Sequence, residues 1–307
     1  MEKYFIITVD TEGDNLWHHK KGNAITTQNA KYIGPFQSLC ESHGFKPVYF
    51  TNYEMAMCDE VTETAKSWQD AGKCEIGVHL HAWNNPPFYE LKGKYKGQSY
   101  LIEYPENVMR DKFQVIYDLL TTKFQCKPVS HRAGRWAMND VYFKILEDFN
   151  IKVDASVTPY VNWSHSKGVT MGGSNYKDSP VQPHYIGKIL EVPVSIRLTR
   201  TPKDHSVFSL IRSGLKRRKI WLRPTKMSLS DLKQVIELID SESDTDYLEF
   251  MIHSSELMLG GCPFFKNQRQ VDDFHLRIES VFEQVKAKGY RGVTLKEYFD
   301  IFKENKK

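Results

Sequence analysis

The strongest constraint on the fold of this chain is a regular alternation along its length. Short apolar segments rich in β-branched and aromatic residues recur, and most are followed by a longer polar stretch with helical spacing. Parallel strands need a long crossover between them, usually a helix, so this alternation predicts βα units around a mostly parallel sheet. The expected strands cover residues 4–10, 46–51, 75–81, 128–132, 151–156, 189–195, 247–253 and 292–295.

The segments between these strands predict helices and one long loop. Residues 158–188 are rich in Gly, Pro, Asn and Ser, which is typical of a loop, and loops of that length are usually functional. The expected helices cover residues 29–42, 54–71, 107–123, 138–148, 228–239 and 270–288, and a last one begins at residue 296.

The number of these units constrains the architecture. Seven or eight of them fit into 307 residues with no linker and no internal repeat. They predict a single α/β domain over residues 1–307 with a closed or nearly closed barrel. An open doubly wound sheet is the alternative, and the absence of GxGxxG after the first strand disfavours its dinucleotide-binding form.

Composition excludes several classes of protein. A net charge of +4 is only mildly basic, so we expect no nucleic-acid binding. No stretch approaches the ~18 apolar residues of a membrane span, and the apolar run before Asp10 is too short for a signal peptide. The five cysteines are scattered and form no CxxC pair, so we expect a reducing, cytoplasmic setting and no cysteine-based zinc site.

Titratable side chains gather where the expected strands end. In α/β barrels the carboxyl ends of the strands meet at one face, which carries the active site. Five of the expected strands deliver such groups to this rim. In chain order they are Asp10, Glu12, His79, His81, His131, Arg132, Asp154 and His253.

Two of these pairs suggest a metal site. Asp10 and Glu12 are two residues apart, as are His79 and His81, and residues at that spacing share a face of a strand. Two carboxylates and two imidazoles together could hold one divalent ion. Taken singly, each has a structural interpretation, as a turn or capping residue or as a core histidine, and Arg132 could be a surface charge.

A basic run in the second half of the chain has two interpretations. It is a solvated helix face or loop, or it holds an anionic lipid carrier, a nucleotide sugar or the membrane surface. The run consists of Lys216, Arg217, Arg218 and Lys219.

Three tryptophans follow rim motifs directly. Trp83, Trp136 and Trp163 could pack in the core, or their faces could stack on sugar rings around a polar cleft.

Five segments carry a resemblance to a known family. In their sequence and order these segments resemble the motifs of polysaccharide deacetylases, a family also called the NodB-homology family or carbohydrate esterase family 4. Within it they resemble the variant found in gene clusters for O-antigen and other surface polysaccharides. The resemblance covers roughly residues 1–259. The segments are Ile7-Thr8-Val9-Asp10-Thr11-Glu12, Glu75-Ile76-Gly77-Val78-His79, Arg132-Ala133-Gly134-Arg135-Trp136, Asp154-Ala155-Ser156-Val157-Thr158-Pro159 and Ile252-His253.

The resemblance implies a fold and an activity. The fold would be a distorted (β/α)7-type barrel, with motifs within residues 4–259 and C-terminal helices in residues 270–307 that complete it. The activity would be the removal of an acetyl group, most often N-acetyl, from a sugar by a hydrolase that uses a divalent metal, usually zinc. The substrate would be an acetylated sugar that is nucleotide-linked, lipid-linked or polymeric.

The resemblance also assigns a metal site. Glu12 would be a metal ligand, although the family more often has Asp there, and His79 matches the first metal histidine. The second histidine normally follows four residues later, where this chain has Trp83, so His81 is the natural substitute.

Further residues match catalytic positions of the family. Asp10 would be the base, Arg132 the arginine that tunes it, Asp154 a supporting acid and His253 the general acid. Glu191, with the nearby Pro193, resembles a recurrent structural segment.

Three other functions stay open at this point. The chain could be a catalytically silent sugar-binding or scaffolding member of the same fold, or a deacylase for formyl or another small acyl group. His-x-His also marks amidohydrolase-type metal barrels, but there it closes the first strand, where this chain has a carboxylate pair.

Overall fold

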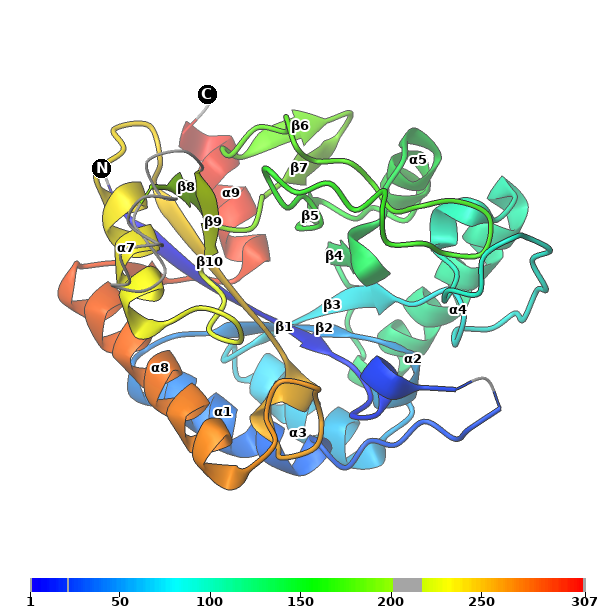
Figure 1. The fold of residues 1–307 in the computed structure, drawn as a ribbon, viewed down its shortest axis with the longest axis horizontal. Coiled ribbons are helices and arrows are strands. Elements are labelled where there is room, and N and C mark those ends of the chain that lie inside the picture. Colours follow the sequence, from blue (N-terminus) through cyan, green and yellow to red (C-terminus); the bar gives the residue numbers. More distant parts are fainter. Residues whose placement is uncertain (1, 21, 201–216, 306–307) are drawn as a thin grey trace.

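The computed structural model describes residues 2–20, 22–200 and 217–305, and its centre is a parallel sheet. Seven strands pair side by side in parallel, in the order β10-β1-β2-β3-β4-β5-β7. In chain order they are β1 (Tyr4–Thr11), β2 (Pro47–Thr51), β3 (Glu75–Leu80), β4 (Ser130–Ala133), β5 (Val153–Asp154), β7 (Ile189–Glu191) and β10 (Tyr247–His253). The sheet curls into a half-barrel, which confirms the predicted α/β class and distorted barrel (Figure 1).

Smaller strands extend this sheet. β6 (His184–Ile186) pairs antiparallel with β7, and β11 (Arg291–Gly292) pairs with the start of β1. A separate antiparallel pair, β8 (Ile196–Thr199) and β9 (Arg218–Trp221), was not expected from the sequence. It bridges toward β10, because Leu222 N donates to Ser195 O at 2.9 Å and Met251 N donates to Leu222 O at 3.2 Å.

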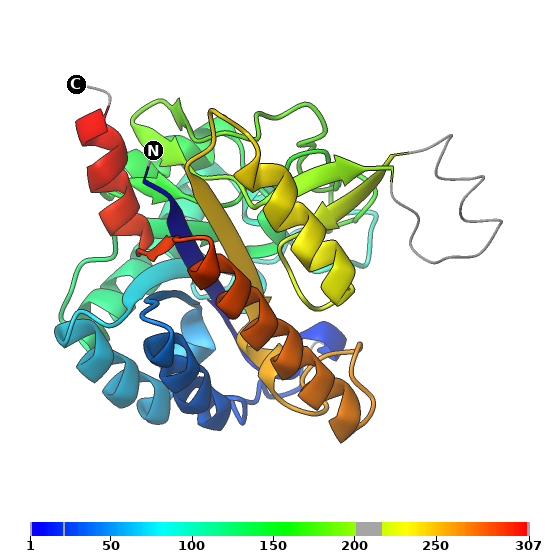
Figure 2. The same ribbon diagram turned by 90° about the vertical axis from the view of Figure 1, so that its left-hand side faces the viewer.

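Helices pack around the sheet much as the alternation predicted (Figure 2). None of those in the described part of the chain is both long and apolar enough to cross a membrane. They are α1 (Ala30–Ser42), α2 (Tyr53–Ala56), α3 (Asp59–Asp70), α4 (Glu106–Phe124), α5 (Asp140–Asp148), α7 (Leu229–Asp240), α8 (Gln268–Ala287) and α9 (Leu295–Asn305).

The prediction of a single helix over residues 54–71 is wrong, because the chain forms two helices, α2 and α3, there. Asn52 caps α2 by accepting from Met55 N, and Cys58 then adopts an extended backbone (φ −86°, ψ 112°) before α3 begins. Asp59 and Glu60 lie in the first turn of α3, where acidic residues favour a helix start.

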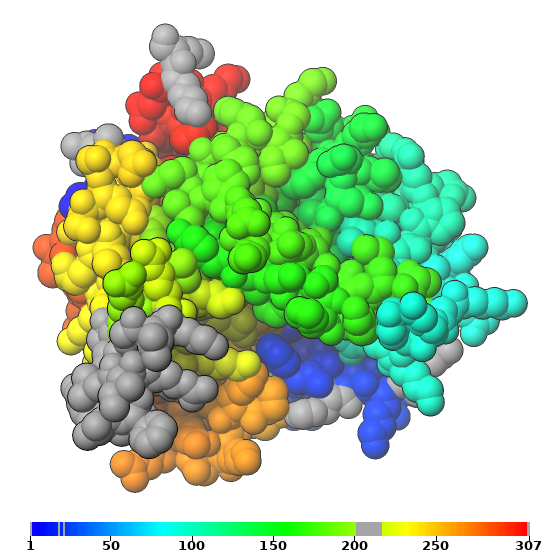
Figure 3. Space-filling model, turned by 45° about the horizontal axis from the view of Figure 1, so that its top comes forward, coloured from blue at the N-terminus to red at the C-terminus, as the bar shows by residue number. Residues whose placement is uncertain are grey.

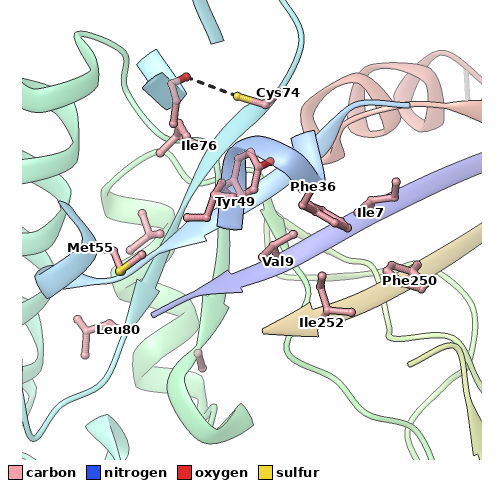
Figure 4. Packing of buried hydrophobic residues seen from close by; sticks show 14 of the residues in the cluster. Ile7, Val9, Phe36, Tyr49, Met55, Cys74, Ile76, Leu80, Phe250 and Ile252 are labelled. Atoms are coloured by element: carbon pink, nitrogen blue, oxygen red, sulfur yellow. Dashed lines mark hydrogen bonds between the residues drawn. The ribbon is translucent and has the colours of Figure 1, made fainter. Parts of the chain in front are cut away.

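Alternating residues of β1 pack into two separate hydrophobic cores. Phe5, Ile7 and Val9 pack with Phe36 of α1 and Phe282 of α8 in the larger core, part of which Figure 4 shows. The other face of the strand belongs to a smaller core.

This smaller core lies between the sheet and the C-terminal helix. Tyr4 and Ile6 of β1 pack there with Tyr298 of α9. Since both faces of β1 are covered, the eight residues of this strand are all buried, as expected for a strand of a parallel sheet.

The long loop after β5 packs against the segment before α4. Glu103 Oε1 accepts backbone hydrogen bonds from Val169, Thr170 and Met171, at 2.8, 2.5 and 3.1 Å. Gly97 lies so close to Lys167 O that an added Cβ would come within 2.0 Å of it, so a side chain there would force the two segments apart. The loop expected over residues 158–188 is therefore anchored from Glu103, and only β6 and two isolated β-bridges interrupt it.

Candidate active site

The pairing register of the strands brings the predicted rim residues together. Asp10 of β1 lies opposite His253 of β10, and His79 of β3 lies opposite Arg132 of β4. Glu12 follows β1 directly and His81 follows β3 directly. These four strand ends therefore deliver their side chains to one place.

A cavity of about 450 Å³ opens over these strand ends. Five of the six tryptophans of the chain line it, including the three that follow rim motifs. Lining residues come from the blue, green, yellow and orange segments, which meet on the face shown in Figure 3. The residues that line the cavity include Asp10, Glu12, Trp17, His79, His81, Trp83, Gln98, Arg135, Trp136, Trp163, Ser166, Trp221, Arg223, Lys226, His253 and Phe264.

Glu12, His79 and His81 form a buried cluster with metal-ligand chemistry. The Nε2 atoms of the two histidines lie 3.1 Å apart, and Glu12 Oε2 lies 2.8 Å from His81 Nε2 and 3.5 Å from His79 Nε2. Ligands bound at about 2.0–2.1 Å around a tetrahedral ion lie about 3.3 Å from one another. The three donor atoms therefore fit one divalent ion.

Hydrogen bonding sets the tautomer of His79. Its Nδ1 lies 2.9 Å from the backbone oxygen of Arg132, and a carbonyl oxygen only accepts, so Nδ1 carries the proton. In the neutral ring the lone pair of Nε2 then faces the cluster, which is the usual arrangement of a metal-binding histidine.

Electrostatics favour the metal-binding form of Glu12 and His81 but not of His79. Burial alone would raise the pKa of Glu12, but His253, His79 and His81 bring it well below its ordinary value. Burial lowers the pKa of His81, which favours the neutral ring that can donate a lone pair. Burial also opposes the charged form of His79, but the negative charges of Asp10 and Glu12 raise its pKa.

Trp83 occupies the place where the resemblance expects a second metal histidine. Its indole lines the cavity and meets the His81 ring edge-on, with ring centroids 6.1 Å apart. His81, two residues before Trp83, therefore supplies the nitrogen beside His79. The indole of Trp83 forms part of the cavity wall.

Asp10 is buried and paired with Arg132. Arg132 Nη1 donates to Asp10 Oδ1 at 2.8 Å, which leaves Oδ2 on the side of His253, 3.7 Å from its Nε2. Burial alone would raise the pKa of Asp10, but the charge of Arg132, with those of His79 and His253, lowers it. Asp10 is therefore ionised at neutral pH and able to accept a proton.

Arg132 serves a second carboxylate that sequence reasoning missed. Its Nη2 donates to Glu249 Oε1, and its Nη1 also donates to Thr8 Oγ1 at 2.8 Å. Thr8 in turn donates to Glu249 Oε1 at 2.5 Å, and burial raises the pKa of Glu249. The sequence did carry a signal for Glu249. It is a charged residue within the apolar strand expected over 247–253, on the same face as His253.

His253 is held by two residues that the motifs do not include. Arg223 Nη2 lies 3.1 Å from His253 Nδ1, and the backbone N of His253 donates to Glu256 Oε2 at 3.0 Å. A guanidinium only donates, so in the neutral ring Nδ1 accepts and Nε2 carries the proton. That Nε2 faces Asp10 and Glu12, at 3.7 Å from a carboxylate oxygen of each.

Arg223 and Glu256 neutralise one another beside this ring. Arg223 Nη2 donates to Glu256 Oε1 at 2.7 Å. Burial would raise the pKa of Glu256, but Arg223 and His253 lower it strongly, so the carboxylate stays charged.

Asp154 does not reach the cavity with the others. It is fully buried and pairs with His131, whose Nδ1 lies 2.6 Å from Asp154 Oδ1 and whose Nε2 lies 2.7 Å from Tyr142 OH. Ser156 and Glu191 complete this buried network. None of these carboxyl, hydroxyl and imidazole groups lines the cavity, and their hydrogen bonds link strands β4, β5 and β7.

The basic run lies partly within a strand. Arg218 and Lys219 belong to β9, so the prediction that they lie on a helix face or in a loop is wrong. This segment is extended because it pairs with β8. Arg218 forms an ion pair with Asp231, and Lys219 donates to Tyr160 O at 3.1 Å. Lys216 lies outside the described residues.

Comparisons with known proteins show the fold of this chain. No protein-family model matches it, and no curated protein sequence matches it. A "putative polysaccharide deacetylase" from Mycobacterium smegmatis is 15% identical with a TM-score of 0.56, over 100% of this chain and 92% of that one. A 4-α-glucanotransferase from Thermococcus litoralis is 14% identical with a TM-score of 0.56, over 98% of this chain and 40% of that one.

A third solved structure is also similar to this chain. It is a GH57-type branching enzyme from Pyrococcus horikoshii, 9% identical with a TM-score of 0.53, over 98% of this chain and 71% of that one. At these identities the similarity establishes a shared fold, and the chemistry must be argued from the site.

Proposed function

We propose that this chain is a metal-dependent hydrolase that removes an acetyl group, with N-acetyl as the first candidate, from a sugar. The observation that carries this proposal is one cavity in which a buried Glu12–His79–His81 cluster lies beside Asp10 and His253. The surrounding tryptophans support a sugar as substrate, because aromatic faces stack on sugar rings.

Zinc is the ion that we propose for this cluster. Two imidazole nitrogens and one carboxylate oxygen form a typical catalytic zinc set, with coordination left open for substrate. A divalent ion there would polarise the acyl carbonyl and make attacking water more acidic.

The residues of the chain supply the proton transfers. Asp10, kept ionised by Arg132, would take the proton from the attacking water through Oδ2. The C–N bond then breaks, and the departing nitrogen needs a proton, which His253 would donate from Nε2 as an imidazolium and so become neutral. In the imidazolium Nδ1 also carries a proton and cannot accept from Arg223, so its acceptor would be Glu256 Oε1, 3.7 Å away.

The decisive experiment measures acetate release from N-acetylated sugars with and without a chelator. We expect Asp10→Asn and His253→Ala each to lose about 10²- to 10⁴-fold in turnover, the usual contribution of general acid–base catalysis. Both variants should keep the wild-type fold by circular dichroism. Wild-type rates in either variant would contradict the assignment.

A catalytically silent sugar binder is the second candidate, and Trp83 favours it. This indole stands where the resemblance expects a metal ligand. Metal analysis separates the two functions, since a silent binder would hold no stoichiometric divalent metal even after reconstitution.

Finer aspects of the substrate and setting stay predictions. They are a formyl or other small acyl group in place of acetyl, a role in O-antigen or other surface polysaccharide synthesis, a cytoplasmic setting, and contact with a lipid or nucleotide carrier through the basic run. Formate release in the same assay would identify the first of these.

A further inference from the structure

Arg135 is a cation in the cavity whose role the catalytic assignment leaves open. It follows β4 in the short turn η3 (Gly134–Trp136) and lines the cavity with its neighbour Trp136. Both residues have positive φ, 57° and 63°. Such backbone is uncommon for large side chains and gathers at functional sites.

Neutral groups hold the guanidinium of Arg135 in place. It stacks over the ring of Tyr100, 3.9 Å from the centroid. Nη1 donates to Gln98 O, and Nη2 lies 3.0 Å from Ser166 Oγ and 3.1 Å from Lys167 O. Two of these partners, Gln98 and Ser166, line the same cavity.

No carboxylate neutralises Arg135 within the described parts of the chain. The other arginines of the site differ: Arg132 pairs with Asp10 and Glu249, and Arg223 pairs with Glu256. Glu103 attracts Arg135 through its charge, but its oxygens accept from the loop backbone instead.

The environment of Arg135 is costly for a charge without an ionic partner. Burial lowers its pKa, the direction expected for a desolvated cation. Its hydrogen bonds to Gln98, Ser166 and Lys167 use three of the five guanidinium N–H groups, so a half-buried cation that is oriented by neutral acceptors and open to a cavity keeps donors for the oxygens of a carboxylate or phosphate.

We propose that Arg135 binds an oxyanion, either a phosphate or a carboxylate, carried by the sugar that occupies this cavity. Lys226 offers a second positive charge: it lines the cavity, its Nζ lies 4.4 Å from the ring centroid of Phe264, and it has no ion pair among the described residues. The inference rests on the proposed function only in placing a sugar at this site.

Sugars without an acyl group test the proposal, because they bind without turnover. Glucose, glucose 1-phosphate and glucuronate are titrated into the metal-loaded protein, and intrinsic tryptophan fluorescence reports binding through the five tryptophans of the cavity. We expect at least one charged sugar to bind about tenfold or more tightly than glucose at low salt, the effect of a charge-assisted hydrogen bond. The better of the two identifies the oxyanion.

Variants show whether Arg135 causes this preference. Arg135→Gln should bind charged and neutral sugars alike, whereas Arg135→Lys should keep part of the preference. Arg110→Gln is the matched control, since Arg110 pairs with Glu106 and Asp148 outside the cavity, and it should behave as wild type. If Arg135→Gln does not fold, Arg135→Lys and the loss of preference at high salt provide the test.

Three results would overturn the proposal: equal affinity for charged and neutral sugars, a preference that survives in Arg135→Gln, or no binding of any of the three. Since binding is read without acyl transfer, an inactive protein that still prefers a charged sugar would refute only the hydrolase function. Acetate release with no such preference would refute only this inference.

Discussion

Replacing Arg132 by methionine tests the buried charge arrangement behind the base. Arg132 is fully buried and makes ionic hydrogen bonds to both Asp10 and Glu249, with the Nη1–Oδ1 distance to Asp10 at 2.8 Å. Methionine would leave two buried carboxylates without a cation. Breaking one buried ion pair from one side typically costs about 3–5 kcal/mol, so we expect Arg132→Met to lower the free energy of unfolding by at least about 3 kcal/mol.

A second substitution should recover part of this loss. Burial raises the pKa of Glu249, and its Oε2 has no hydrogen-bond partner among the residues that the structure describes, so its charge is costly once Arg132 is gone. Glu249→Gln removes that charge but keeps an oxygen for Thr8 Oγ1. The double variant should therefore be more stable than the sum of the single effects by about 1–3 kcal/mol, a usual coupling energy for contacting residues.

Urea unfolding of the four proteins at pH 7 measures this coupling. Arg110→Met, which breaks an exposed pair, should change stability by no more than about 1 kcal/mol. Single effects that add to within about 0.5 kcal/mol would refute the argument, because Glu249 would then not depend on Arg132. So would an Arg132→Met protein as stable as wild type.

Three further predictions concern other positions. Gly134→Ala should weaken metal binding measured by competition with a chelator dye, because the new Cβ would lie 2.4 Å from Leu80 O and 3.0 Å from His81 Nδ1; unchanged affinity would contradict this packing. His81→Ala should abolish stoichiometric zinc in metal analysis while the helical content measured by circular dichroism stays that of wild type, and full zinc occupancy would remove His81 from the site. Lys112 is fully buried, and burial lowers its pKa to about 8, whereas its pKa in the unfolded chain is near 10.4. Between these two pH values the unfolded chain binds more protons than the folded protein. The stability of wild type relative to Lys112→Met should therefore rise with pH across this window, and a flat difference in urea midpoints would show that Lys112 titrates normally.

Local patterns explain how much of the fold could be predicted. β1 and β10 were expected within one residue of their observed ends, because buried parallel strands are continuous apolar runs bounded by polar residues. The β8–β9 pair was missed because its strands are four residues each and lie far apart in the chain. The break at Cys58 was missed because residues 54–71 lack Gly and Pro, the usual helix breakers.

The strand-end pattern predicted the placement of Asp10, Glu12, His79, His81 and His253, because all five lie at the carboxyl ends of parallel strands. It did not place Asp154, since β5 is two residues long and its side chain turns toward His131.

The sequence by itself determined which groups end each strand, since periodicity and strand order are local properties. Only the tertiary structure decided how those groups are charged and oriented. Glu249 shares Arg132 with Asp10, Arg223 sets the tautomer of His253, and Arg135 keeps a charge without a carboxylate partner in the described structure. These features depend on contacts between residues up to about 120 positions apart, and a pKa or a tautomer follows from such neighbours rather than from residue type.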